Sequence, residues 1–241
     1  MEDGYEASGE FLDVLSGPAW QVLRDPVRAA LRGVDPAHGP VLDVGAGTGL
    51  GTQILADACP TATVLAVEPS PVLRAVLLSR VAADADLRER VTVLAGDALS
   101  ASLPEQLGAV LAANMIGHLP PQDRREFWHR VAARLSPGAP LVVNLQPPAE
   151  PAVVGFATFG AVRIGRHTYE GGGAAEPAAP DTVTWRMRYR VLDGDGVALR
   201  EHTVDYPWHV LSEYDLRTEL AEAGLRAEVG PMDVVRAVRA G

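Results

Sequence analysis

The sequence contains no lysine: all 21 basic residues are arginine, so lysine is absent from any catalytic scheme. A single cysteine, Cys59, excludes a disulfide within the chain and a metal site built from several cysteines. Cys59 stands before Pro60, at the expected end of a helix, where we expect it only to pack. No metal centre is therefore expected.

Long apolar runs are also missing, since no segment approaches the roughly 18 residues that a membrane-spanning helix needs. Residues 1–6 are acidic and lack the basic and apolar regions of a signal peptide. The formal net charge is −10, and no dense basic stripe offsets it. Without a signal peptide or a membrane-spanning run, we expect a cytoplasmic protein that does not bind membranes. Because such a chain repels phosphate backbones, we expect no nucleic acid partner.

From Val41 onward, short apolar runs alternate with helical patterns, which is typical of a parallel sheet with crossover helices. The expected strands are Val41 to Val44, Val64 to Val67, Val91 to Leu94, Ala109 to Ala113 and Leu141 to Leu145. The expected helices between them are Leu50 to Ala58, Pro71 to Ala83 and Gln122 to Leu135. A helix over 212–223 and two short strands, 226–229 and 234–238, follow later. This order predicts an α/β, Rossmann-like, doubly wound and mostly parallel seven-stranded sheet.

Four segments divide the expected fold. Residues 1–34 contain a helix from Pro18 to Leu31 with one apolar stripe, which either covers the sheet or forms a lid carrying Tyr5 and Phe11. Residues 35–146 form the core. Residues 147–210 form an insertion, and residues 211–241 complete the core.

The insertion combines two patterns. The region from Gln146 to Pro180, rich in Gly, Ala and Pro and containing three consecutive glycines at 171–173, predicts a mobile loop. The run 193–196, Asp-Gly-Asp-Gly, predicts an antiparallel hairpin between the arms 183–192 and 197–210.

Alternation along the hairpin separates two kinds of side chain. One face is expected to hold Trp185, Met187, Tyr189, His202, Val204, Tyr206 and Trp208. This aromatic face is expected either to cap a substrate pocket or to form a homodimer surface. The opposite face carries Arg186, Arg188 and Arg190, which indicate an acidic substrate or partner, or a solvated face paired with Glu201.

The most informative segment follows the first expected strand, where Asp43 precedes glycines at 45, 47 and 49. Alternating glycines permit a sharp turn and close approach to a ligand, which is typical of a nucleotide-cofactor loop. A dinucleotide loop has a small residue at the end of its G-x-G-x-x-G/A pattern, but Leu50 or Thr52 would stand there. Asp43 instead favours a cofactor with cationic groups, such as the ammonium and sulfonium of S-adenosylmethionine.

Four motifs in order resemble those of the class I S-adenosylmethionine-dependent methyltransferases. They are Val41 to Gly49, Val67 to Ser70, Gly96 to Ala98 and Arg134 to Gly138, and the resemblance covers roughly residues 38 to 146. Gly45, Glu68, Asp97 and Asn114 also fall at strand ends, where ligands of such sheets bind.

The resemblance implies a role for each motif. The loop of Gly45, Ala46, Gly47, Thr48 and Gly49 would lie along the methionine part of the cofactor. Glu68, followed by Pro69, would accept hydrogen bonds from the ribose hydroxyls, and Asp97, followed by Ala98, would meet the adenine amine. Met115, after Asn114, would pack near the ring. The competing structural interpretations are a bond within the loop for Asp43, a helix cap for Asp97 and a core position for Met115.

Residues 116–119, Ile-Gly-His-Leu, also resemble small-molecule methyltransferases of secondary metabolism, including amino-sugar N-methyltransferases. Histidine suits proton transfer at neutral pH, so His118 is expected to be a general base or a substrate orienter, with a helix cap as the competing interpretation. The resemblance makes Tyr5 the second catalytic candidate. Arg166, His167 and Tyr169 are weighed as pocket residues, but an ordinary surface or strand position is favoured.

We therefore expect an S-adenosylmethionine-dependent methyltransferase acting on an oxygen or nitrogen of a small metabolite or short peptide, in natural product biosynthesis. Two alternatives remain at this point. One is a non-catalytic cofactor-binding regulatory or scaffold protein. The other is an NAD-dependent oxidoreductase, because the spacing of Glu68 also suits an NAD ribose.

Overall fold

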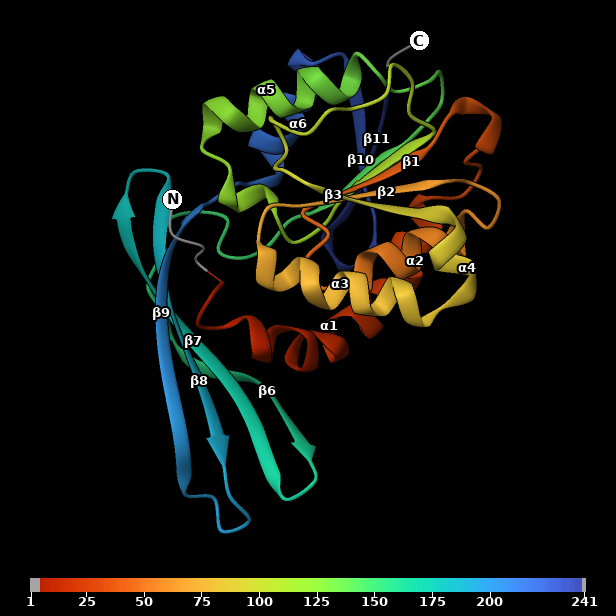
Figure 1. Ribbon diagram of the computed structural model, residues 1–241. Helices are drawn as coiled ribbons and strands as arrows, with labels where there is room; N and C mark the ends of the chain where they lie inside the picture. The colour runs from red at the N-terminus through yellow and green to blue at the C-terminus, as the bar shows by residue number, and fades with distance from the viewer. Residues whose placement is uncertain (1–4, 240–241) are drawn as a thin grey trace.

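The computed structural model describes residues 5–239 and contains two sheets, shown in Figure 1. The larger has seven strands in the order β10-β11-β5-β4-β1-β2-β3, with only β11 antiparallel to both of its neighbours. Its strands are β1 Val41–Val44, β2 Val64–Glu68, β3 Val91–Ala95, β4 Ala109–Ala112, β5 Leu141–Asn144, β10 Leu225–Val229 and β11 Val234–Arg239. The predicted Rossmann-like, doubly wound sheet is confirmed.

Helices cover both faces of this sheet (Figure 1). They are α1 Gly9–Ala30, α2 Leu50–Ala58, α3 Pro71–Ala83, α4 Ala85–Arg90, α5 Pro121–Ala132 and α6 Glu213–Glu222, and single 3-10 turns lie at 36–38, 116–118 and 231–233. Helices α5 and α6 pack on the face that holds Leu42 and Val44, whereas α1, α2 and α3 pack on the face that holds Val41 and Val64. The alternation along β1 therefore supplies two cores.

Capping residues in the sequence fix where the helices begin. The Ser70 hydroxyl accepts a hydrogen bond from the Leu73 amide, with Pro71 at the first helical position of α3. Ser212 caps α6 in the same way. Helix α5 ends at Ala132 rather than at Leu135 as predicted.

Helix α1 begins at Gly9, so the prediction that a helix starts at Pro18 was wrong. Pro18 and Pro26 both lie inside the helix, although proline removes a backbone donor. Phe11 and Leu15, one turn apart, are buried against Tyr189 and Val191 of the second sheet. This packing sustains the first half of α1, which the sequence pattern missed.

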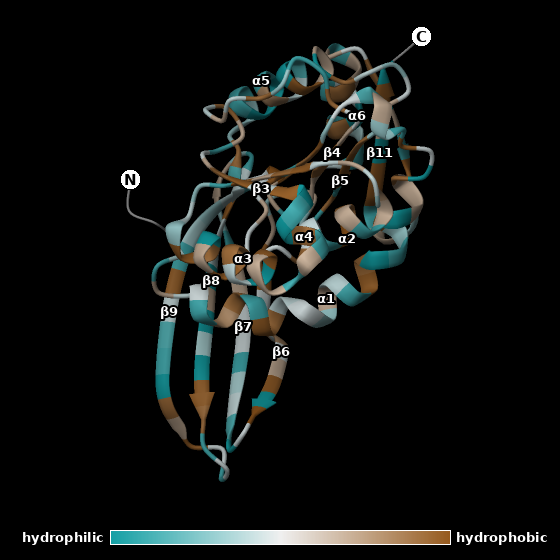
Figure 2. Ribbon diagram, turned by 45° about the vertical axis from the view of Figure 1, so that its right-hand side comes forward, coloured by the Kyte–Doolittle hydropathy of each residue, from teal (hydrophilic) through white to brown (hydrophobic). Residues whose placement is uncertain are grey.

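The second sheet is antiparallel, in the order β6-β7-β8-β9, and extends away from the larger sheet with α1 beside it (Figures 1 and 2). Its strands are β6 Val154–Ile164, β7 His167–Ala179, β8 Thr182–Leu192 and β9 Ala198–His209. The predicted hairpin of β8 and β9 is confirmed, but the mobile loop predicted between Gln146 and Pro180 is largely β6 and β7.

Close packing explains why glycines occupy an interior strand. A Cβ on Gly171 would lie 2.5 Å from the Phe159 ring, and one on Gly172 would lie 2.4 Å from the Phe156 ring. The glycines of β7 therefore make room for aromatic side chains of β6 that lie across them. Considered without its packing against β6, the glycine-rich composition of β7 predicts a loop.

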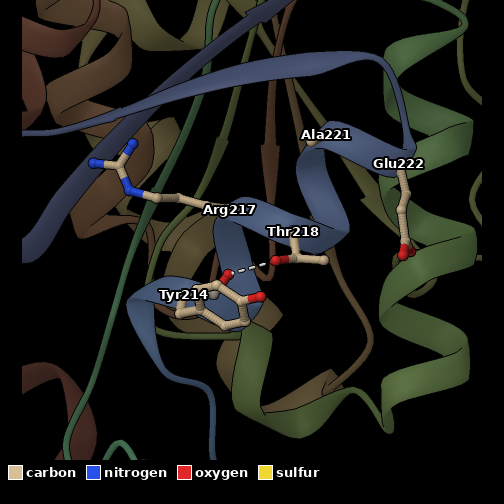
Figure 3. Close-up of a pocket in the computed structure, with 5 residues that line it drawn as sticks. All are labelled: Tyr214, Arg217, Thr218, Ala221 and Glu222. Carbon is tan, nitrogen blue, oxygen red and sulfur yellow. Dashed lines mark hydrogen bonds between the residues drawn. The ribbon is translucent and has the colours of Figure 1, made fainter.

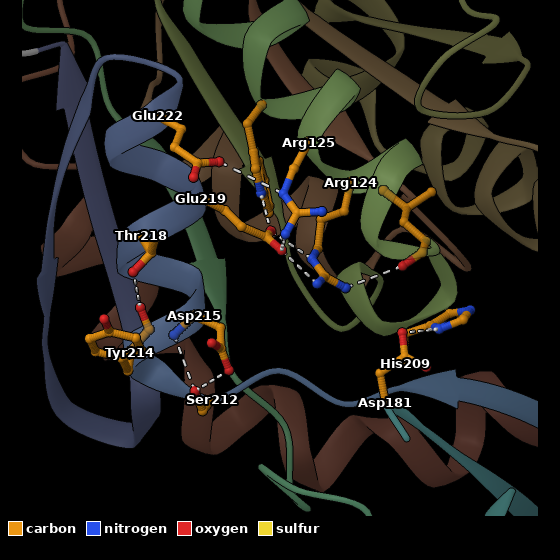
Figure 4. A network of polar contacts seen from close by, with 12 residues as sticks. Arg124, Arg125, Asp181, His209, Ser212, Tyr214, Asp215, Thr218, Glu219 and Glu222 are labelled. Carbon is orange, nitrogen blue, oxygen red and sulfur yellow. Dashed lines mark hydrogen bonds and ion pairs between the residues drawn. The ribbon is translucent and has the colours of Figure 1, made fainter. Parts of the chain in front are cut away.

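A buried ion pair joins α5 to α6 (Figure 4). The Arg124 guanidinium donates to both oxygens of Glu219 at 2.8 Å, and the Trp128 indole N–H donates to Glu219 at 2.9 Å. Both charged side chains are less than 5% exposed. Three donors thus satisfy a carboxylate that would otherwise be costly to bury.

Candidate active site

The glycine loop connects β1 to α2 in left-handed conformations. Gly45, Gly47 and Gly49 have φ values of 67°, 56° and 91°. A Cβ on Gly49 would lie 2.6 Å from Leu77, whereas beside Gly47 only the Gly45 carbonyl oxygen comes as near as 4.0 Å. The loop is therefore packed at its end but open at its centre, where a ligand has room.

Asp43 lies beneath this loop and is 3% exposed. Burial raises its pKa to about 7, with the nearby Glu68 charge acting in the same direction and a hydrogen bond from Thr52 opposing it. The Thr52 hydroxyl donates to Asp43 Oδ2 at 2.6 Å. The carboxylate therefore has a structural bond and also the electrostatics of a site that a cation would stabilise.

Glu68 ends β2 with its carboxylate 3% exposed. One oxygen accepts a hydrogen bond from the Ser70 amide and the other from the Gly47 amide, each at 2.8 Å. These bonds orient the Glu68 carboxylate at the glycine loop, and a carboxylate is a group suited to accept hydrogen bonds from hydroxyls. It ties the second motif directly to the glycine loop.

Asp97 follows β3 and is exposed. Its Oδ1 accepts hydrogen bonds from the Leu99 and Ser100 amides at 2.8 Å and 2.7 Å. Burial alone would raise the pKa of this carboxyl, but the bonds from Ser100 and Leu99 outweigh it and lower the pKa. Residues 98–100 form a turn rather than a helix, so the helix cap weighed for Asp97 is wrong: both bonds lie within this turn and use a single oxygen. Ala98 beside it is buried.

Asn114 lies just beyond the end of β4 and has a φ of 58°. Its amide N–H donates to Asn144 Oδ1 at 2.7 Å, and Asn144 Nδ2 donates back to Asn114 Oδ1 at 2.8 Å. Met115 is buried against Gly45, where a Cβ on the glycine would lie 2.9 Å away. Sequence reasoning missed Asn144, although its place at the end of β5 was a usable signal.

Tyr5 and His118, 113 residues apart, meet at the edge of the second sheet. The Tyr5 hydroxyl lies 2.7 Å from His118 Nε2. The His118 ring contacts Trp208 edge-on at 4.9 Å between centroids and lies 6.0 Å from Tyr206. Desolvation lowers the His118 pKa to about 4, so the imidazole is neutral at pH 7. The structure brings both catalytic candidates together.

The aromatic face of the hairpin lies as predicted. Trp185 pairs with Tyr206, Met187 with Val204 and Tyr189 with His202, which confirms the expected alternation. Tyr189 is 1% exposed, shares a side-chain hydrogen bond with Tyr206, and has its pKa raised chiefly by burial.

A cavity of about 270 Å³ opens on this face beside Trp208. Its walls are Gln146, Pro147, Val154, Ala157, Phe159, Gly173, Trp185, Met187, Tyr206 and Trp208, none of them charged. Arg166, His167 and Tyr169 are not among them: Tyr169 instead packs near the Phe11 ring. The lining residues from β6 and β7 were not predicted, because the composition of that segment predicts a loop.

Arginines on the opposite face are engaged within the insertion. Arg186 pairs with Asp205 at 2.8 Å and Arg190 with Glu170, so the pairing predicted with Glu201 was wrong for Arg190. Arg188 lies over the Phe156 ring at 4.3 Å. These contacts support the solvated, internally paired face rather than an acidic partner.

A separate open groove lies on α6, lined by Tyr214, Arg217, Thr218, Ala221 and Glu222 (Figure 3). It has none of the residues weighed above. Within residues 5–239, no group of His, Cys, Asp and Glu side chains could hold a metal ion, and no helix is long and apolar enough to cross a membrane.

The family model described as a methyltransferase domain matches residues 41–138. No curated protein matches the sequence. Among solved structures, the chain is similar to S-adenosylmethionine-bound CalS10, an amino pentose methyltransferase from Micromonospora echinaspora, at 21% identity over 100% of both chains with a TM-score of 0.76.

Two further structures share the fold. The sugar N-methyltransferase KedS8 from a Streptoalloteichus species has 20% identity, with 95% of this chain and 92% of that one covered and a TM-score of 0.75. The glycopeptide N-methyltransferase MtfA has 24% identity, 90% and 87% coverage and a TM-score of 0.60. Residues 41–138 thus match a methyltransferase domain, and the chain shares the fold of these methyltransferase structures along its length.

Proposed function

We propose that the protein methylates an amine nitrogen of a small, sugar-like metabolite in natural product biosynthesis. The observation that carries this proposal is the Tyr5–His118 pair beside an uncharged, aromatic-walled cavity. Aromatic rings suit the apolar faces of a small ring. The similar structures CalS10 and KedS8 are described as acting on amino pentose and sugar nitrogen, which favours this acceptor over a peptide.

The residues at the strand ends fit S-adenosylmethionine. Buried Asp43 favours a cationic neighbour, the Glu68 carboxylate bonded to the Gly47 amide is of a type that binds hydroxyls, and the space beside Gly47 is open. We propose that these residues hold the cofactor together with Ala46, Thr48, Pro69, Asp97, Ala98, Asn114 and Met115. When bound, it would supply a sulfonium-activated methyl group, which passes in line to an acceptor lone pair as the neutral thioether of S-adenosylhomocysteine leaves.

Tyr5 and His118 act on the acceptor. With a pKa of about 4, His118 is too weak a base to take a proton from an ammonium at neutral pH, so it serves as a hydrogen-bond acceptor that holds the Tyr5 hydroxyl. The Tyr5 oxygen then accepts an N–H of the amine and points its lone pair along the line of transfer. The pair therefore orients substrate rather than abstracting its proton.

Residues 5–34 and 147–210 form the cap over this site in our proposal. The exposed apolar side chains of the edge strand β6, Phe156, Phe159 and Ile164, further support a homodimer through the insertion. Sedimentation velocity tests it: a monomer at micromolar concentration would refute the dimer and leave the enzyme unaffected.

The activity test supplies labelled cofactor with a panel of amino sugars, free and nucleotide-linked, and with glycopeptides, and detects the methylated product by mass spectrometry. Tyr5→Phe should lower kcat/KM about 10²-fold because it removes the orienting hydroxyl. The matched control is Tyr214→Phe, since Tyr214 is 78% exposed on α6. Cofactor binding without methylation of any acceptor would instead favour the non-catalytic alternative.

The pH profile separates the two roles of His118. Because its pKa is about 4, the neutral form persists above pH 5, so kcat/KM should show no histidine inflection between pH 5.5 and 8. An inflection near 6.5 that disappears in His118→Asn would show that His118 acts as an ordinary general base.

A further inference from the structure

Arg80 of α3 joins three elements around the glycine loop. Its Nε donates to the Thr48 carbonyl oxygen at 2.9 Å, inside the loop. Its Nη1 donates to Gln53 Oε1 of α2 at 2.9 Å, and its Nη2 pairs with Asp13 of α1. One side chain thus contacts the loop, the helix that follows it and the N-terminal helix.

The arrangement depends on the planar guanidinium of arginine, which carries several donors in fixed directions. The guanidinium is planar and rigid, so fixing its Nε on Thr48 also fixes the direction in which Nη2 meets Asp13. The stem packs against the loop as well, since a Cβ on Gly49 would lie 3.2 Å from Arg80 Cδ. A shift of the loop therefore moves the guanidinium.

Helix α1 in turn positions Tyr5. The Gly9 amide, at the first residue of α1, donates to the Tyr5 carbonyl oxygen at 2.7 Å. A Cβ on Gly9 would lie 2.4 Å from Val72 of α3, so the start of α1 rests directly on that helix. The path from Arg80 to Tyr5 consists of the ion pair with Asp13, the first part of α1 from Asp13 back to Gly9, and the turn that joins Gly9 to Tyr5.

We propose that Arg80 is a positioning residue that couples cofactor binding in the glycine loop to the seating of α1, and so to the placement of Tyr5 at the acceptor. A ligand that orders the loop fixes Thr48, which holds Arg80 and, through Asp13, the N-terminal part of α1. This inference rests on the proposed function.

The test compares hydrogen exchange of α1 amides in the whole protein with and without saturating S-adenosylhomocysteine. The main variant is Asp13→Asn, which removes the charge on α1 and leaves the Arg80 bonds to Thr48 and Gln53 in place. The matched control is Asp57→Asn, because Asp57 pairs with Arg24 and Arg28 of the same helix without touching the loop.

In the wild type, S-adenosylhomocysteine should slow exchange in α1. In Asp13→Asn this ligand-dependent slowing should shrink about tenfold, because the loss of one charged hydrogen bond changes an equilibrium by about that factor. Asp57→Asn should keep the full slowing. A purely structural ion pair would speed exchange equally with and without ligand. Only coupling between ligand binding and the Arg80–Asp13 pair would change the difference in α1 exchange with and without ligand.

Equal ligand-dependent slowing in the wild type and in Asp13→Asn would overturn the coupling, as would bound ligand that leaves wild-type α1 unchanged. In both cases calorimetry would still show binding, and the proposed function would stand. Absence of S-adenosylhomocysteine binding to the wild type would overturn both.

Discussion

Asp43→Asn should stabilise the cofactor-free protein at alkaline pH but not in acid. Asp43 is fully enclosed, and its pKa rises from 3.8 to about 7, mainly through burial. Because the folded-state pKa exceeds the unfolded one, the carboxyl's contribution to stability is complete below about pH 4 and is lost as pH rises through 7.

The expected magnitude follows from these two pKa values. Between pH 5 and pH 8 the wild type should lose about 3 kcal/mol of unfolding free energy through this group, because the unfolded state is already ionised at pH 5 while the folded state ionises near 7. Asparagine retains an acceptor for Thr52 and does not titrate, so the variant loses nothing at this position.

Urea unfolding at pH 5, 6, 7 and 8 without cofactor measures this difference. Asp195→Asn, at an exposed position in the β8–β9 turn, controls for the loss of one surface carboxylate. S-adenosylmethionine should flatten the wild-type slope, since a cation near Asp43 favours its ionised form. Parallel pH curves for the wild type and Asp43→Asn would refute the reasoning.

Two other perturbations test the packing that surrounds the site. Glu219→Gln should destabilise the protein by about 3–5 kcal/mol because it leaves Arg124 buried without its countercharge, whereas Glu228→Gln, in an exposed pair, should cost less than about 1 kcal/mol in urea unfolding. Equal losses would contradict the burial argument. Gly117→Ala places a Cβ 1.9 Å from Trp208, so displacement of this ring should lower kcat/KM about 10²-fold at unchanged S-adenosylhomocysteine affinity. Gly194→Ala, with no atom within 4 Å of the new Cβ, is its control, and a similar loss there would rule out the ring as the cause.

The core was predictable because its signals are local. Helices α2 and α3 have the predicted bounds, and each core strand from β1 to β5 ends within one residue of its expected end. Short apolar strands, the glycine loop and Pro71 after Ser70 each specify structure through a few neighbouring residues. The meeting of Tyr5 with His118 was expected only from resemblance, since no periodicity relates residues that far apart.

What could not be predicted depends on partners distant in sequence. In strand β7, Gly171 and Gly172 pack against Phe156, Phe159 and Leu15, and Gly173 packs against Met187, so packing rather than propensity supports their strand conformation. The first half of α1 needs the second sheet for the same reason. The proposed role of Arg80 depends on its bond to Asp13, which is 67 residues away in the sequence. The sequence of α3 by itself indicates only an arginine near the end of a helix.

The two sheets divide the chemistry of the molecule. The edge formed by β1, β2, β3 and β4 holds the glycine loop and carboxylates, whereas most of the cavity wall comes from a segment that leaves after β5 and returns before α6. Such a segment can exchange its lining side chains without altering the order of the seven strands. Acceptor choice can therefore diverge in evolution, or be exchanged by swapping the insertion, while the methyl-donor edge is inherited unchanged.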